Sequence, residues 1–144
     1  MFSKIVVALN DLPESQRALR TAIDLARLSN AELQTVSILE DLPAYISFTV
    51  VVDPGAPAAM TEERQNRHKE MHEKAANLAQ ELGVLARGSI VVGKEVHAIL
   101  RFLKEQNADL LVVGLHQPDF YLSRLWNSVY DLALDATCSV LGVH

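Results

Sequence analysis

The residues of this chain that could do chemistry gather around a strand-like run that ends in glycine. Leu110-Leu111-Val112-Val113 is apolar, and Gly114 follows it before a polar stretch and a helix-like segment. A glycine lets a ligand approach the backbone closely, and the first N–H groups of a helix have no partner within that helix. This combination indicates a place where a phosphate group could bind.

Histidines offer a second kind of chemistry. His68 and His72 are four residues apart in a segment that predicts a helix, so their side chains share one face. Lys69 occupies the place where a zinc protease has Glu, and the sequence offers no third ligand, so we expect two solvated side chains and no metal. His116 follows Gly114 closely, where it could contact an anion or respond to pH, and a loop hydrogen bond is the alternative role.

Nucleophile motifs do not emerge from the sequence. The serines lack a Gly-x-Ser-x-Gly elbow, and Gly93-Lys94 lacks the flanking residues of a Walker A motif. Cys138 belongs to an apolar run that predicts a buried strand, away from any histidine. We therefore expect no catalytic residues and no enzymatic activity.

Apolar runs alternate with helical patterns along the whole chain. The runs are rich in β-branched residues, as is typical of strands buried on both faces of a parallel sheet. Asp11 predicts the N-cap of the first helix and Asn30 its end, the second helix is expected to begin near Thr61, and Ser123 and Ser128 are expected at helix starts. The expected strands are residues 5–9, 33–39, 89–92, 110–113 and 140–143, and the expected apolar helix stripes are residues 19–26, 71–82, 96–103 and 125–136.

This alternation predicts a single α/β domain over residues 1–144. We expect a Rossmann-like or flavodoxin-like sandwich, a five-stranded parallel sheet in the order 3-2-1-4-5 with four helices on its faces. In such sheets ligands bind beyond the carboxyl ends of the strands where the strand order reverses, here between the first and fourth strands. The topology brings Asn10 and Asp11 close to Gly114 and His116.

One connection, from Glu40 to Met60, is longer than most. It carries Pro43, Pro54 and Pro57 around an apolar run over residues 46–52. It could be a lid, an added edge strand, a partner surface, or a loop that simply packs onto the body of the domain.

Charge and composition exclude several classes of partner. Thirteen Lys and Arg against eighteen Asp and Glu give a formal net charge of −5 without a basic cluster, which argues against nucleic acid. No apolar run approaches membrane-spanning length, and the amino terminus lacks the layout of a signal peptide. With one cysteine there is no internal disulfide, so we expect a cytoplasmic protein that binds no membrane.

Three stretches together resemble the universal stress protein (UspA) family. They are Lys4 to Leu9 with Pro13-Glu14-Ser15, Ala108 to Gly114, and Ala136 to Leu141. The resemblance spans the chain and implies a cytoplasmic homodimer formed through the last strand, Cys138 to Val143. An uncovered apolar edge strand at the end of the chain also invites such pairing.

Nucleotide-binding members of that family carry the pattern Gly-x2-Gly-x9-Gly-Ser/Thr after the fourth strand. Gln117 and Asn127 replace the second and third glycines here, and Pro118 has no N–H to donate. Asn10 stands where the family has an acidic residue, and the residues around His116 resemble the UspA-type branch, which is regarded as not binding ATP. The candidate binding residues are Asn10, Asp11, Ile38, Gly114, His116, Gln117, Asn127 and Ser128.

Two hypotheses of function follow from the resemblance and its departures. The first is a non-enzymatic, dimeric stress-response module that acts through protein contacts, has a degenerate phosphate loop and needs no cofactor. The second is a sensor that holds ATP or AMP with an altered loop. A hydrolase would need a general base near Ser128, and Asp11 is the only candidate nearby, so we do not favour it.

Overall fold

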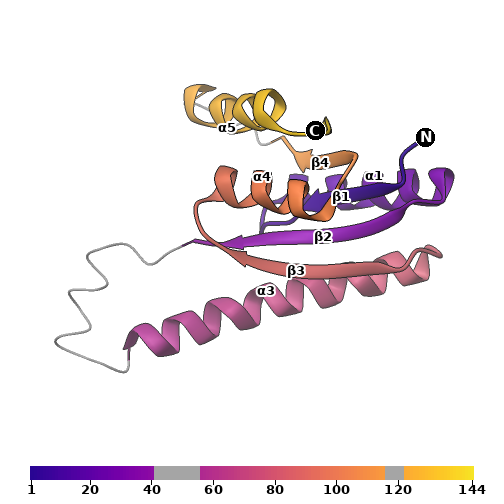
Figure 1. Ribbon diagram of the computed structural model, residues 1–144. Coiled ribbons are helices and arrows are strands. Elements are labelled where there is room, and N and C mark those ends of the chain that lie inside the picture. The colour runs from indigo at the N-terminus through magenta and orange to yellow at the C-terminus, as the bar shows by residue number, and fades with distance from the viewer. Residues whose placement is uncertain (41–55, 116–121) are drawn as a thin grey trace.

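The computed structural model describes residues 1–40, 56–115 and 122–144, and within the helices it describes side chains from residue 62 and from residue 129 onward. The order of elements confirms the predicted alternation of strands and helices (Figure 1). The elements are β1 (Lys4–Ala8), α1 (Pro13–Ser29), β2 (Glu32–Leu39), α3 (Ala56–Glu81), β3 (Ala86–Val92), α4 (Glu95–Gln106), β4 (Leu110–Gly114), α5 (Leu122–Asp135) and β5 (Ser139–Val143). Most of the long connection expected from Glu40 to Met60 lies outside the described residues, and its last part, from Ala56, is helical.

The five strands form one parallel sheet in the order β3-β2-β1-β4-β5, as the sequence predicts. β1 is the central strand, and in its register Val7 stands between Thr35 of β2 and Val112 of β4. The strand order therefore reverses between β1 and β4. Residues that follow β1, β2 and β4 meet at one edge of the sheet.

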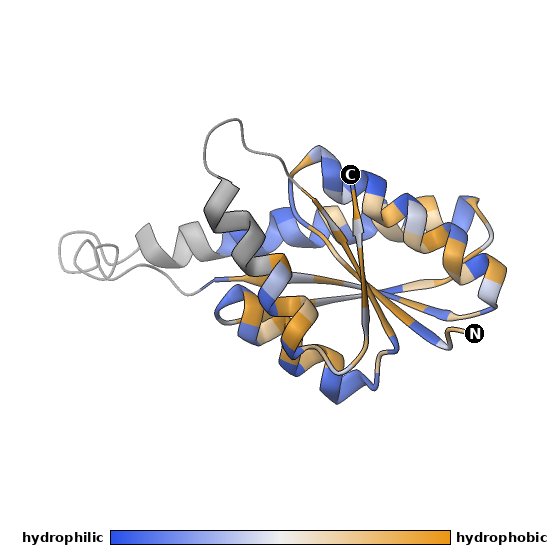
Figure 2. Cartoon of the chain, turned by 90° about the horizontal axis from the view of Figure 1, so that it is seen from above, coloured by the Kyte–Doolittle hydropathy of each residue, from blue (hydrophilic) through white to orange (hydrophobic). Residues whose placement is uncertain are grey.

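Two hydrophobic layers cover the sheet because strand side chains alternate between its faces. Ile5 and Val7 of β1 pack with α1 and α3 on one face, whereas Val6 packs with α4 and α5 on the other. In Figure 1, α3 runs beneath β2 and β3 and α4 lies on the opposite side of the sheet. Apolar residues follow the strands in the view of Figure 2, and the helices are mixed in hydropathy, as amphipathic helices require.

The helix ends differ in part from prediction. Asn30 ends α1 in the left-handed conformation, with φ 53°, as expected. The N-cap of α1 is Leu12 and not Asp11, and α3 begins well before Thr61. Because α5 begins at Leu122, Ser128 lies in its interior, so the prediction of a helix start at Ser128 was wrong.

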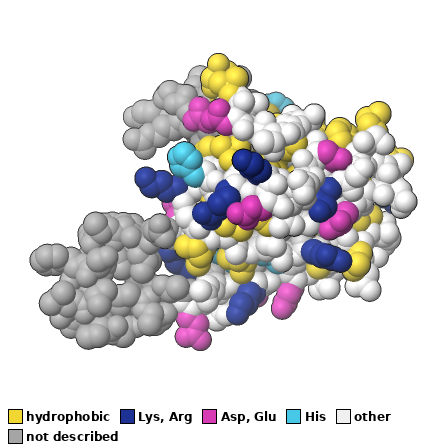
Figure 3. Space-filling view, in the orientation of Figure 1, with side chains coloured by type: hydrophobic (Ala, Val, Ile, Leu, Met, Phe, Trp, Pro, Cys, Tyr) yellow, Lys and Arg dark blue, Asp and Glu magenta, His cyan; other side chains and the backbone are white. Residues whose placement is uncertain are grey.

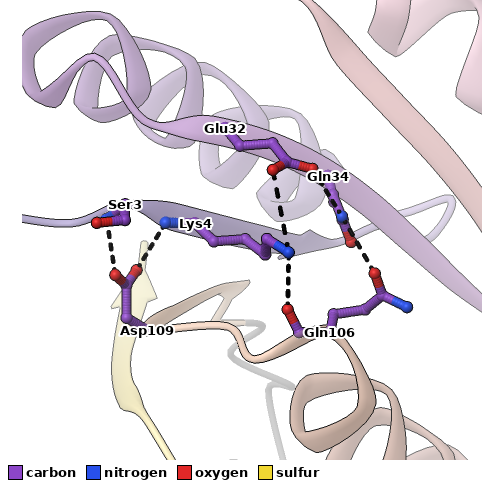
Figure 4. A network of polar contacts seen from close by, with 6 residues as sticks. All are labelled: Ser3, Lys4, Glu32, Gln34, Gln106 and Asp109. Atoms are coloured by element: carbon purple, nitrogen blue, oxygen red, sulfur yellow. Dashed lines mark hydrogen bonds and ion pairs between the residues drawn. The ribbon is translucent and has the colours of Figure 1, made fainter.

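A polar network closes the amino ends of the strands, at the edge opposite the predicted ligand site (Figure 4). The carboxylate of Asp109 accepts from the backbone N–H of Ser3 at 2.7 Å and of Lys4 at 3.1 Å. The ammonium group of Lys4 donates to the carbonyl of Gln106 at 2.8 Å and lies 3.9 Å from the carboxylate of Glu32. The start of β1 is thereby tied to β2, to the end of α4 and to the start of β4.

Candidate functional site

A cleft of about 490 Å³ opens at the carboxyl ends of β1 and β2. Its position agrees with the edge at which an open parallel sheet binds ligands. The ends of β1 and β2 and the residues that follow them form one part of its wall, and residues of α3 and α4 form the rest. The lining residues are Ala8, Leu9, Asn10, Asp11, Leu12, Val36, Ile38, Glu40, Arg64, His68, Met71, Glu95 and Ile99.

Asn10, Asp11 and Ile38 are the predicted site residues that the structure brings together in this cleft. Asn10 holds its own turn, because its side-chain oxygen accepts from the N–H of Leu12 at 2.9 Å. The N–H of Asn10 donates to the hydroxyl of Ser15, also at 2.9 Å. These two bonds connect β1 to α1 without a side-chain N-cap. Asp11, between them, is exposed and supplies the carboxylate of this turn.

Charges in the cleft are mostly negative. Asp11, Glu40 and Glu95 supply three carboxylates, and the guanidinium of Arg64 donates to the backbone carbonyl of Glu40 at 3.1 Å. The surroundings of Glu95 raise the pKa of its carboxyl, first by reducing its hydration and then through the nearby charge of Glu40. On the face drawn in Figure 3, basic and acidic side chains are interspersed among the described residues. The cleft is therefore a poor place for a phosphate and a better one for a neutral or hydrogen-bond-donating group.

His68 and His72 are not the solvated pair that the sequence predicts. His72 is 9% exposed, and its Nδ1 and Nε2 each lie 2.7 Å from a hydroxyl oxygen, of Thr35 and Ser37 respectively. His68 is half-buried, and its Nδ1 lies 2.7 Å from the same Ser37 oxygen. Two buried hydroxyls of β2 thus hold both rings of α3.

Burial keeps both histidines neutral near pH 7. Loss of hydration lowers the pKa of His72 to about 4, and the neighbouring His68 adds to this effect. Burial also lowers the pKa of His68, against the opposing charge of Asp11 and with help from Arg64 and Arg67. A neutral imidazole offers one N–H donor and one acceptor nitrogen, which is what a chain of hydroxyl contacts requires.

Thr35 and Ser37 are functional candidates that sequence reasoning missed. The signal was present, because polar and apolar residues alternate from Thr35 to Ile38 in β2, and a strand buried on both faces is normally apolar throughout. Both hydroxyls point to the face that α3 covers, and both are 1% exposed. A strand with a polar residue at every second position, facing a helix whose histidines are four residues apart, indicates a buried polar network.

Gly114 has a packing role. A Cβ at this position would lie 2.6 Å from the backbone carbon of Glu14, at the start of α1. The glycine therefore allows α1 to approach the end of β4 closely. Among the described residues that line the cleft, Gly114 does not occur.

The remaining predicted site residues follow β4. His116 and Gln117 lie outside the described residues. Asn127 and Ser128 lie within α5, where a backbone N–H bonds to the carbonyl four residues earlier. The N–H groups of these two residues therefore belong to the interior of the helix.

Two further searches cover the described part of the chain only. Within it, none of the helices is both long and apolar enough to cross a membrane. Within the same residues, no three or more His, Cys, Asp or Glu side chains are grouped so that they could hold a metal ion.

Known proteins resemble this chain over its full length. The model of the Universal stress protein family matches residues 1–144. Universal stress protein YxiE of Bacillus subtilis (strain 168) is 31% identical over 150 residues, which cover 100% of both chains. Universal stress protein UspA from Lactobacillus plantarum has a similar structure, with a TM-score of 0.80 and 17% identity, covering 99% of this chain and 97% of that one.

A third similar structure is a universal stress protein in complex with cAMP, with a TM-score of 0.74 and 23% identity, covering 99% of this chain and 97% of that one. The two solved structures establish the likeness of fold. The match of the family model over residues 1–144 establishes membership of a family in addition to the fold. The chain belongs to the universal stress protein family.

Proposed function

We propose that this protein is a non-enzymatic, cytoplasmic stress-response module that does not bind nucleoside triphosphates tightly. The observation that carries this proposal is the position of Asn127 and Ser128 inside α5. A phosphate cradle needs free backbone N–H groups in a loop or in the first turn of a helix, and these two residues stand beyond the first turn. The three carboxylates of the cleft also disfavour a polyphosphate.

The absence of catalysis is part of this proposal. Ser37 and Nε2 of His72 are 2.7 Å apart, the spacing of a nucleophile and its base. Ser37 is, however, 1% exposed and lies between two imidazole rings. A substrate carbonyl has no path to this oxygen, so the pair serves the structure.

A titration of ATP with magnesium, followed by calorimetry, tests the proposal. We expect ATP to bind no more tightly than adenosine, because the phosphates find no cradle. The variant Gln117→Gly/Asn127→Gly is the comparison: a gain of affinity for ATP would mean that these two side chains are the obstacle, and no gain would mean that the helical backbone is. Saturable micromolar binding of ATP to the unmodified protein would contradict the proposal.

A second function, a nucleotide sensor, is favoured by the cleft itself. Its volume of about 490 Å³ lies in the range of small-molecule sites, and it combines apolar walls with a few polar groups. A relative of the same fold was solved with cAMP. We propose that any ligand, such as AMP, is held here through its nucleoside part. Displacement of a fluorescent adenosine derivative by unlabelled nucleosides would test this.

Homodimer formation through Cys138 to Val143 is a further part of the proposal. β5 is an edge of the described sheet, and Leu141 on it is 36% exposed. A parallel sheet that ends in an uncovered apolar strand invites pairing with a second copy. Light scattering coupled to size-exclusion chromatography gives the molar mass in solution, and 15.9 kDa, the mass of one chain, would contradict a dimer.

A further inference from the structure

A chain of hydrogen bonds links the cleft to the interior of the sheet. It runs from His68 to Ser37, then to His72 and to Thr35, and each of its three contacts is 2.7 Å long. Thr35 and Ser37 are each 1% exposed. Water does not compete for these contacts, so the proton positions along the chain are set by the protein.

The direction of the chain follows from its inner end. Thr35 Oγ1 also lies 3.4 Å from the carbonyl oxygen of Arg87, which can only accept. Because the hydroxyl of Thr35 donates to that carbonyl, its oxygen accepts from Nδ1–H of His72. The neutral ring carries one hydrogen, so its Nε2 accepts from the hydroxyl of Ser37, and Ser37 in turn accepts from Nδ1–H of His68. Only this polarity satisfies all four contacts.

The outer end of the chain is a hydrogen-bond acceptor. Neutral His68 with its hydrogen on Nδ1 leaves a lone pair on Nε2, and this side chain lines the cleft. Among the described residues, no partner bonds to Nε2. The lining also holds the carboxylates of Asp11, Glu40 and Glu95, which are acceptors, the amide of Asn10, whose oxygen accepts from the N–H of Leu12, and Arg64, which donates to a backbone carbonyl.

We propose that His68 determines the specificity of this cleft by accepting a hydrogen bond from an exocyclic amine on a flat heteroaromatic ring, as in an adenosine-type nucleoside. Ile38, Met71 and Ile99 give the apolar wall against which such a ring can lie. A ligand whose ring carries the amine donates to Nε2 of His68, whereas a ligand without the amine leaves Nε2 without a partner. This inference rests on ligand binding in the cleft, the second function proposed above.

The proton positions can be measured on the unmodified protein. Nitrogen-15 NMR of the imidazole rings distinguishes the two neutral tautomers. At pH 7.5 we expect the Nδ1–H tautomer for both His68 and His72. The Nε2–H tautomer at His68 would make this atom a donor and would overturn the proposal, whatever any variant does.

The ligand preference is tested with adenosine and purine riboside, which differ only in the exocyclic amine. We expect adenosine to saturate the protein below about 1 mM and purine riboside to bind about tenfold more weakly. His68→Leu should abolish that preference, and His68→Gln, whose amide oxygen can accept, should keep part of it. His97→Leu is the matched control, because His97 is exposed on α4 and outside the cleft lining, and it should keep the full preference.

The two ways of failing are distinguishable. If neither nucleoside binds, ligand binding in the cleft is wrong and this inference falls with it. If both bind equally, or if His68→Leu keeps the preference for adenosine, the cleft binds ligands but His68 does not choose them. Circular dichroism of each variant confirms that the fold is intact before the titrations are compared.

Discussion

Gly88 of β3 lies directly against the imidazole of His72, so closely that a Cβ on Gly88 would stand 2.8 Å from Nδ1. The ring is held in this place by hydroxyls on the neighbouring strand, at 2.7 Å on each nitrogen. The buried polar network therefore depends on both strands. Because Gly88 has no side chain, β3 leaves room for the ring, and β2 supplies the hydroxyls that bond to it.

Replacing Gly88 by Ala should destabilise the protein. The added Cβ meets a ring that cannot move without losing two hydrogen bonds, and overpacking of this kind costs about 1–3 kcal/mol. Urea denaturation followed by circular dichroism measures the free energy of unfolding. In a His72→Ala background the same change should cost less than about 1 kcal/mol, because the obstacle is gone. An equal loss in both backgrounds would show that the ring is not the obstacle.

Stability should fall as the pH falls below the pKa of an unfolded histidine. His72 has a pKa of about 4 in the folded protein and 6.5 as a free side chain, so between these values only the unfolded state binds the proton. The free energy of unfolding then decreases by about 1.4 kcal/mol per pH unit, or about 3 kcal/mol in all. Unfolding in urea at pH 7 and pH 4.5 measures the change.

His72→Gln should lose this part of the pH dependence. His97→Gln, on the exposed surface of α4, should retain it. The comparison isolates His72 from other groups that titrate in the same range, among them Glu95, whose raised pKa acts in the opposite direction. A pH profile that is unchanged in His72→Gln would mean that the ring has the same pKa in the folded and unfolded states.

Gly114→Ala should be more harmful than Gly142→Ala. The Cβ at Gly114 would lie 2.6 Å from a backbone carbon of Glu14, whereas the Cβ at Gly142 would meet the side-chain end of Leu115 at 2.8 Å. The backbone at the start of α1 cannot move as easily as the end of a side chain. We therefore expect the free energy of unfolding to fall by about 1–3 kcal/mol for Gly114→Ala and by less for Gly142→Ala. Thermal unfolding without nucleotide provides the comparison, and equal losses would refute the packing role of Gly114.

Leu141→Glu should separate the proposed dimer. The substitution places a charge on the exposed side of β5, where pairing with a second copy would bury it. Leu85→Glu is the matched control, because Leu85 is 80% exposed just before β3, the opposite edge of the sheet. Sedimentation velocity should give a monomer for the first variant only. Dissociation by both variants, or by neither, would place the contact elsewhere.

The fold was predictable because its strands are recognisable in the sequence. Five apolar runs with β-branched residues, separated by amphipathic helices, fix a parallel α/β sheet, and Asn30 ends its helix in the conformation that its side chain tolerates. The start of α5 was not predictable from Ser128, because a serine favours a helix start only when a loop precedes it, and here helical residues precede it.

The site was predictable only in outline. The edge of the sheet, Asn10, Asp11 and Ile38 came from topology and from the family pattern, and all three residues line the cleft. The histidines of α3 were misjudged because the charged residues around them suggested a solvated helix. What decides their burial is the pair of hydroxyls on β2, which lie more than thirty positions away in sequence and become neighbours only on folding.

The clamp of Asp109 on Ser3 and Lys4 has a consequence for the way the chain is made. The carboxylate bonds to backbone groups 106 and 105 positions earlier, and β1 is the strand between β2 and β4. During synthesis from the amino end, β1 has one neighbour as soon as β2 leaves the ribosome, but its other side stays open until β4 has emerged. The strand of this sheet that is translated before the other four is thus among the last to be enclosed, and a pause in translation before Asp109 would leave the apolar centre of the sheet uncovered on one side.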